Sequence, residues 1–179
     1  DTVWAYLCSE TEKAEARKRG EDADKLAGIY ARIINKALES KPADMVITTH
    51  VCRGNFRSTW ISEGGYEPVA ELLLAGIAYD GYFLEYDSER AGGLEPLRFL
   101  PKGKKRVVVG LVTSKSGTLE KTDDIKRRLD EASKYAALDQ LCLSPQCGFA
   151  STEEGNNLAE DDQWRKLEMI VAIARDVWK

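Results

Sequence analysis

Hydrophobic and polar residues alternate along the chain in segments that have the period of a helix and segments that have the period of a strand. Residues 22–39 follow the i, i+3, i+4, i+7 spacing of an amphipathic helix, with apolar side chains at Leu26, Ile29, Ile33, Ile34 and Leu38. A β-branched run at 44–49 follows and ends at His50. This pair of segments predicts a helix that leads into a strand.

The alternation continues to the end of the chain. Helices are predicted over 66–75, 119–136 and 160–177, and strands over 81–86, 106–112 and 141–144. The run RVVVGLV at 106–112 is apolar almost throughout, as in a strand covered on both faces. Strands that alternate with helices predict a parallel sheet with right-handed crossovers.

Four such strand and helix units are half of a (β/α)8 barrel of the TIM type, which typically needs about 250 residues. We therefore expect residues 1–179 to form one half of a barrel domain, completed by a missing half or by a partner chain. A small open α/β sheet is the alternative. The chain opens DTVWAYLCSE without a Met, which we interpret as a fragment or as part of a longer chain.

Charge and apolar content exclude several classes of partner. The chain has 26 Lys and Arg against 30 Asp and Glu, and a net charge of -4 does not favour nucleic acid or an anionic membrane. The longest apolar runs are far shorter than the roughly 20 residues of a membrane helix, and no leader is evident. We expect a soluble, cytoplasmic protein whose four cysteines are reduced.

The strongest local signal is the pair His50 and Cys52, just past a predicted strand. Positions two apart in a strand point the same way, so the two side chains can converge above the sheet. An imidazole and a thiolate suit zinc. A buried cysteine beside a hydrogen-bonded histidine is the alternative.

Glu85 ends the predicted strand GYFLEY, and an acid in such an apolar run needs a cation, a metal or a solvent-filled opening. A salt bridge with Arg53, Arg57 or Arg90 is the alternative to metal ligation. Both Glu85 and the preceding pair fall where barrel enzymes place their sites, at the carboxyl ends of strands.

Cys147 lies in SPQCGF, beyond the last strand, where Pro145 ends regular pairing and Gly148 allows a turn. That is a position typical of a site. Cys142 and Cys8 sit inside apolar segments and are predicted to be packed core residues.

Three segments together resemble a known family. HVCRGN (50–55), FLEYDSERAG (83–92) and LSPQCGF (143–149) resemble the catalytic domain of cobalamin-independent methionine synthase, in particular its shorter, single-domain relatives. The resemblance runs from His50 to the C-terminus, with the motifs in the family's order. It implies that the chain supplies the last four β/α units of the barrel, and it implies zinc held by His50, Cys52, Glu85 and Cys147.

The resemblance also implies a reaction. Homocysteine thiolate would attack the methyl group on N5 of a 5-methyltetrahydrofolate-type donor and give methionine. Three protein anions and a neutral imidazole make an electron-rich zinc, which keeps a substrate thiol deprotonated and still nucleophilic. Hydrolytic zinc chemistry is disfavoured because such sites usually rest on His and carboxylates with an open water position.

The sequence departs from the family at the proton donor. Full-length members are thought to use a His after the penultimate strand, where this chain reads GLVTSKSG (110–117), and His50 is its only histidine. Lys115 or a water would have to protonate the leaving nitrogen. Otherwise the donor differs from folate, for example a corrinoid-bound methyl group, or the acceptor is another small thiol.

Substrate-binding residues of the family lie mainly in the first half of the barrel. Asp1 could be the remnant of an acidic pair that binds substrate there. Arg53, Arg57 and Arg90 could meet substrate carboxylates, with solvated or ion-paired arginines as the alternative. Aromatic side chains could stack on a pterin, although packing explains most of them: Trp60, Tyr66, Tyr82, Phe83 and Phe99. A non-catalytic half-barrel that binds zinc is the remaining hypothesis.

Overall fold

The computed structural model describes residues 3–150 and 152–179. Within them one sheet has four strands: β1 (Thr48–Val51), β2 (Gly81–Glu85), β3 (Arg106–Val112) and β4 (Leu141–Pro145). Neighbouring strands are parallel, and their order in the sheet follows their order in the chain. The predicted α/β class with parallel strands is therefore confirmed, while these residues form an open sheet and do not close a barrel.

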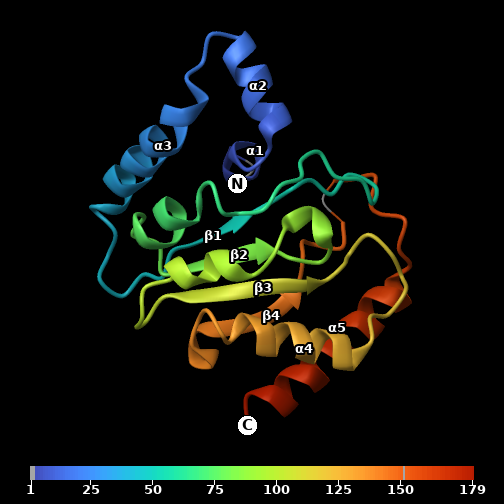
Figure 1. Cartoon of the computed structure of the whole chain (residues 1–179). Coiled ribbons are helices and arrows are strands. Elements are labelled where there is room, and N and C mark those ends of the chain that lie inside the picture. Colours follow the sequence, from blue (N-terminus) through green and yellow to red (C-terminus); the bar gives the residue numbers. More distant parts are fainter. Residues whose placement is uncertain (1–2, 151) are drawn as a thin grey trace.

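Helices lie beside both edge strands of this sheet, β1 and β4 (Figure 1). Three precede β1 in the chain and gather on its side: α1 (Val3–Leu7), α2 (Glu10–Lys18) and α3 (Ala23–Leu38). Two lie on the β4 side: α4 (Thr122–Ala132) and α5 (Glu160–Val177). The shorter helical turns are η1 (Glu71–Ala75), η2 (Glu89–Ala91), η3 (Glu95–Phe99) and η4 (Leu138–Gln140).

Several strands and helices begin or end at residues other than those predicted, for local reasons. The first strand was predicted over 44–49, but the ladder with β2 begins only at Thr48, so His50 lies inside the strand. The amide of Ile47 instead donates to the Asp80 carboxylate at 2.7 Å. The helix predicted over 66–75 is reduced to a turn followed by the π-helical η1. The helices α1 and α2 were not predicted.

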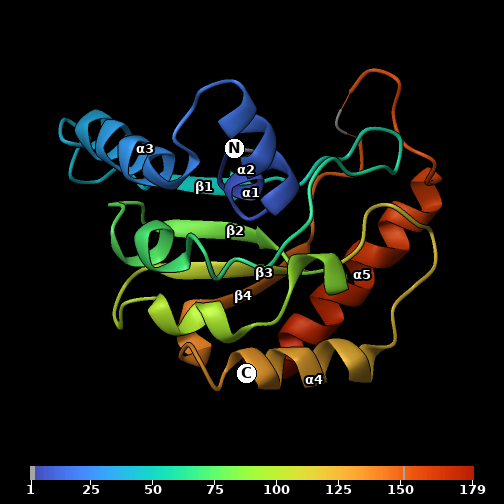
Figure 2. The ribbon, with the colours of Figure 1, turned by 45° about the horizontal axis from the view of Figure 1, so that its top comes forward.

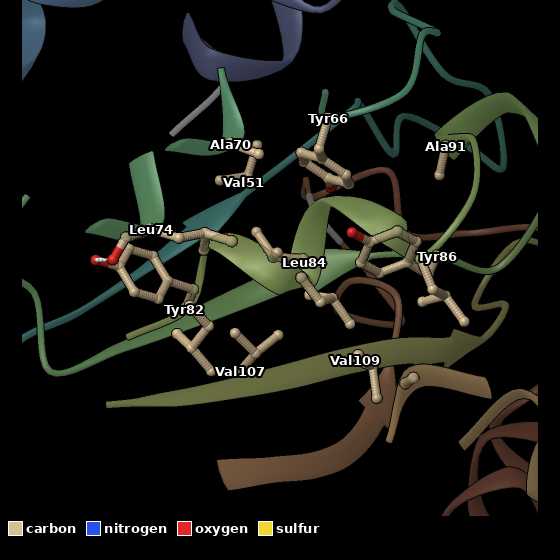
Figure 3. Close-up of a cluster of buried hydrophobic side chains, with 14 of the residues drawn as sticks. Val51, Tyr66, Ala70, Leu74, Tyr82, Leu84, Tyr86, Ala91, Val107 and Val109 are labelled. Carbon is tan, nitrogen blue, oxygen red and sulfur yellow. Dashed lines mark hydrogen bonds between the residues drawn. The ribbon is translucent and has the colours of Figure 1, made fainter. Parts of the chain in front are cut away.

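One face of the sheet carries the hydrophobic core (Figure 3). Val51, Tyr82, Leu84, Val107 and Val109 alternate along the strands and are all at most 2% exposed. Side chains of the segment between β1 and β2 cover them, including Tyr66, Ala70 and Leu74. Figure 2 shows the strands in the same order from a second direction, with α1 beside β1.

The opposite face is partly open. His50, Phe83, Val108 and Cys142 stand in register across the four strands, so their side chains form one row on this face. All four keep solvent exposure, which reaches 38% for Phe83. The prediction that Cys142 is a packed core residue is therefore wrong, because it lies on the uncovered face, whereas Cys8 is buried as predicted.

Among the described residues, no helix is both long and apolar enough to cross a membrane. The longest helix, α5, carries acidic residues in its first turn and charged residues along its length.

Candidate metal centre

Four chemically suited side chains meet at the carboxyl edge of the sheet. His50 lies in β1, Cys52 follows that strand, Glu85 is the last residue of β2, and Cys147 comes just after β4. One ligand atom from each lies within 4.8 Å of those of the other three. The parallel topology explains this meeting, because the carboxyl ends of parallel strands share one edge. This group could hold a metal ion.

Individual distances within the group are short. The Sγ atoms of Cys52 and Cys147 are 3.9 Å apart. The Nε2 atom of His50 is 3.6 Å from Oε1 of Glu85. Each of these pairs joins residues far apart in sequence, so the tertiary fold alone brings them together.

The Glu85 carboxyl group is fully buried. Burial raises its pKa to about 7, against the lowering effects of the Arg53 amide, His50 and Arg90. The Arg53 backbone N–H donates to Oε1 at 3.1 Å, and Nη2 of Arg90 lies 3.5 Å from Oε2. The salt bridge considered as an alternative is therefore present alongside the metal-binding geometry, and a nearby cation would favour the ionised carboxylate.

The Cys52 thiol has a high proton affinity in the metal-free protein. Its hydrogen bond with the Cys147 thiol raises its pKa to about 11, with burial adding to this effect and His50 opposing it. The amide of Gly54 donates to Cys52 Sγ at 3.4 Å. A bound cation would reverse the balance, because metal ligation stabilises the thiolate.

Tyr66 fixes the end of β2, a role that the sequence did not reveal. Its buried hydroxyl accepts a hydrogen bond from the Glu85 amide at 3.0 Å and donates to the Glu85 carbonyl at 3.2 Å. The carboxyl-bearing residue is thereby held by its backbone as well as by its side chain.

Loops from three strand ends meet beside the two cysteines. The amide nitrogen of Asn55 donates to the Gly148 carbonyl at 2.7 Å and to Oγ of Ser114 at 3.3 Å. Gln146 also donates to Ser114 Oγ, at 2.6 Å. Asn55, Ser114 and Gln146 are each at most 5% exposed. The sequence pattern does not identify these three residues, because polar residues in loops give no periodic signal.

Lys115, considered above as a proton donor, belongs to the same group of loops. Its ammonium donates to the carbonyls of Gly54 at 2.8 Å and Thr59 at 3.0 Å, and to Oδ1 of Asn55 at 3.1 Å. Burial lowers its pKa, and the charge of Arg90 adds to this effect.

An open hollow adjoins the metal-binding group on the uncovered face of the sheet. Its volume is about 510 Å³, and its walls include His50, Phe83, Ser144 and Cys147. Two of the four ligand candidates therefore border space that a small molecule could enter.

The remaining predicted residues have varied positions. Asp1 lies outside the described residues. The Arg53 guanidinium is buried over the Tyr66 ring, 4.4 Å from its centre, and Arg90 stacks over Trp60, while Arg57 is exposed.

The aromatic side chains considered for stacking on a ligand also differ in their burial. Tyr66 and Tyr82 are core residues, so stacking on a ligand is excluded for them in this arrangement. Trp60 and Phe83 are exposed, and Phe99 is partly buried against the core.

Comparisons with known proteins give relatives along the whole chain. No family model matches it. The chain is 54% identical over 179 residues to the uncharacterised protein YxjG of Bacillus subtilis and 51% identical to YxjH of the same organism. It covers 47% and 48% of these proteins, so it spans about half the length of the curated relatives it matches.

Two solved structures share the fold. A candidate vitamin-B12-independent methionine synthase from Listeria monocytogenes matches the whole chain with a TM-score of 0.74 and 40% identity, over 47% of its own length. A B12-independent methionine synthase from a Shewanella species, solved with selenomethionine, matches 86% of the chain with a TM-score of 0.67 and 20% identity, over 44% of its own length. The chain is thus similar in sequence and fold to about half of the Listeria protein, and in fold to about half of the Shewanella protein.

Proposed function

We propose that this chain carries the zinc site of an enzyme that transfers a methyl group to the thiol of homocysteine, from a 5-methyltetrahydrofolate-type donor. The observation that carries the proposal is the meeting of His50, Cys52, Glu85 and Cys147 at one edge of the sheet. The likeness to the Listeria and Shewanella structures supports the reaction class.

The spacing of the ligand atoms suits zinc. A tetrahedral ion with Zn–S distances of about 2.3 Å places two sulfurs about 3.8 Å apart, and its N and O ligands, at about 2.0–2.1 Å, about 3.3 Å apart. The corresponding distances here are 3.9 Å between Cys52 and Cys147 and 3.6 Å between His50 and Glu85. Small side-chain rotations would complete such a site. Two thiolates, an imidazole and a carboxylate also match the ligand types that zinc prefers.

Each residue has a distinct role in this proposal. A zinc ion held by this set would supply a positive charge that keeps a substrate thiol deprotonated near neutral pH. Cys52 and Cys147 would keep the site electron-rich, so that the thiolate remains nucleophilic. Arg90 lies 3.5 Å from the Glu85 carboxylate and would help to hold it in place beside such an ion. The hollow beside His50 and Cys147 offers a route for the thiol.

We further propose that the chain is one half of a barrel domain, completed by a further half or a partner chain. The four-stranded parallel sheet and the length of the relatives support this. Apolar side chains are exposed near both edges of the sheet. Val46, which precedes β1, is 74% exposed, and Ile33 on α3 is 60% exposed, while Trp164 and Val171 are exposed on α5, which packs against β4. A second half would cover such residues.

A corrinoid methyl donor is the second candidate. Protonation of a folate leaving nitrogen needs an acid, whereas a methyl group leaving cobalt needs none. The three hydrogen bonds of Lys115 favour this alternative, because they occupy the ammonium that would act as the acid. With a folate donor, a water molecule or a residue from the other half would have to provide the proton.

The test has two stages. Zinc content of the purified chain should be one ion per chain, and absence of tight metal binding would overturn the proposal. Methyl transfer to homocysteine is then measured with methyltetrahydrofolate and with methylcobalamin, with and without the part of YxjG that this chain does not match, supplied as a second polypeptide. Turnover with methyltetrahydrofolate but not with methylcobalamin supports the first candidate. Turnover with methylcobalamin but not with methyltetrahydrofolate supports the second. Zinc binding without turnover under every condition would identify a non-catalytic zinc-binding half-barrel.

A further inference from the structure

We propose that Lys115 is a positioning residue which, through Asn55, holds the Cys52 and Cys147 loops at the separation that the metal site requires. This inference deepens the proposed function and rests on it for the identity of the metal. Lys115 would clamp together the loops that follow β1, β3 and β4, and this clamp can be measured without any metal.

The Lys115 ammonium uses all of its hydrogen-bond donors. An ammonium group has three N–H donors, and the Lys115 ammonium has three acceptors, the carbonyls of Gly54 and Thr59 and the side-chain oxygen of Asn55. Two of these lie at opposite ends of the segment 54–59. The lysine therefore closes this segment into a compact loop immediately after Cys52. To act as an acid it would first have to break one of these contacts.

Lys115 also sets the orientation of the Asn55 side chain. Because Oδ1 accepts from Lys115, the amide nitrogen of Asn55 faces the opposite way and donates to Gly148 and Ser114. Gly148 is the neighbour of Cys147. A single amide thus joins the loop that begins at Cys52 to the loop that carries Cys147, and Lys115 fixes which end of that amide faces which loop.

The side chains that link the loops are buried. Ser114 is fully buried and Asn55 is 5% exposed, so the loss of one partner would leave polar groups unsatisfied. The loop around them also has unusual backbone angles, with φ of +96° at Gly54, 45° at Arg57 and 67° at Ser58. Such conformations persist only when the surrounding contacts determine them. The clamp accounts for a strained loop beside a metal-binding cysteine.

The test compares Lys115→Met, which removes the donors, with Lys115→Arg, which keeps donors but cannot release a proton near neutral pH. Lys134→Met, at an exposed lysine just past the C-terminal end of α4, is the matched control. In metal-free protein, the rate of Cys52–Cys147 disulfide formation with diamide reports how often the two thiols meet. We expect Lys115→Met to slow it at least about fivefold, with Lys115→Arg closer to the wild type.

Metal affinity gives a second readout. Competition with a chelator should show about 10–100-fold weaker cobalt binding in Lys115→Met, the range typical of residues that orient ligands. The cobalt–thiolate absorption band should weaken in the same variant and recover in Lys115→Arg. Circular dichroism checks that each variant is folded, and Asn55→Asp, which removes the bridging N–H donors at nearly constant size, should reproduce the slower cross-linking if Lys115→Met unfolds.

The outcomes separate the two proposals. Unchanged cross-linking and unchanged cobalt affinity in Lys115→Met would overturn the clamp. If the wild type binds neither zinc nor cobalt but Lys115→Met still slows cross-linking, the clamp stands and the proposed function fails. An acid role predicts instead that Lys115→Arg abolishes turnover while cross-linking and metal affinity stay as in the wild type.

Discussion

The hydroxyl of Tyr66 hydrogen-bonds both backbone polar groups of Glu85, whose carboxylate belongs to the group that could hold a metal ion. Both partners are buried, Tyr66 to 1% exposure and Glu85 completely. A residue of the segment between β1 and β2 therefore sets where β2 ends, and with it where the carboxylate lies.

Tyr66→Phe should destabilise the protein by about 1–3 kcal/mol, because the Glu85 amide and carbonyl lose a buried partner without a change in packing volume. Urea unfolding measures the difference. Tyr79→Phe, at a partly exposed tyrosine, is the control and should change the free energy of unfolding by much less. Equal effects of the two substitutions would show that the Tyr66 hydroxyl contributes nothing specific.

The pH dependence of stability should show the raised pKa of Glu85. Burial raises this pKa from 4.5 to about 7, so between these values the native state holds a proton that the unfolded chain has lost. Stability from this group is therefore full below pH 4.5 and falls as pH rises to 7, in total by about 3 kcal/mol.

Glu85→Gln removes this contribution while keeping the size of the side chain. The difference in unfolding free energy between metal-free wild type and Glu85→Gln should shift against the wild type as pH rises from 4.5 to 7.5. Saturating zinc should reverse the trend, since metal binding displaces protons and strengthens with pH. A difference that is constant across this range in metal-free protein would contradict the raised pKa.

Cys147→Ser should weaken metal binding more than the roughly 10–100-fold that orienting residues contribute, because it removes a ligand itself. Cys142→Ser is the matched control. Cys142 is half-buried in β4, the strand that precedes Cys147, and lies outside the group of candidate ligands. Cobalt titration with detection of the thiolate band measures both variants. Retention of one tightly bound ion by Cys147→Ser would remove this residue from the ligand set.

Gly54→Ala should disturb both stability and metal binding. Gly54 has φ of +96°, and an added Cβ would lie 2.9 Å from the backbone nitrogen of Ile61. Gly20→Ala is the control, since Gly20 has φ of +84° with no atom within 4 Å of the added Cβ.

Backbone strain is common to the two glycine variants and should cost about 1–2 kcal/mol in each. The clash adds about 1–3 kcal/mol for Gly54→Ala alone. Urea unfolding gives both values, and cobalt titration should show weaker binding only in Gly54→Ala, because the amide of Gly54 donates to Cys52. If Gly54→Ala and Gly20→Ala lose the same unfolding free energy and the same cobalt affinity, the contact with Ile61 is relieved at little cost.

Local patterns in the sequence were sufficient for some of the elements, although not for α1 and α2. β3 and α5 begin and end at the predicted residues, because a continuous apolar run and a long helical period each identify their element without help from neighbours. The alternation of strands and helices gave the parallel sheet, and the parallel sheet placed the ends of β1, β2 and β4 on one edge. The candidates His50, Cys52, Glu85 and Cys147 followed from these positions and from the family resemblance.

The tertiary structure decided the rest. Pairing register, which no periodicity determines, placed His50 inside β1 and Cys142 on the uncovered face. The contacts of Tyr66 with Glu85, and of Lys115 and Asn55 with the cysteine loops, join segments that are distant in sequence. The sequence by itself determined which residues could bind a metal. Their distances, the burial of Glu85 and the occupied ammonium of Lys115 depend on contacts between loops, and such contacts form only when the strands that carry them pair.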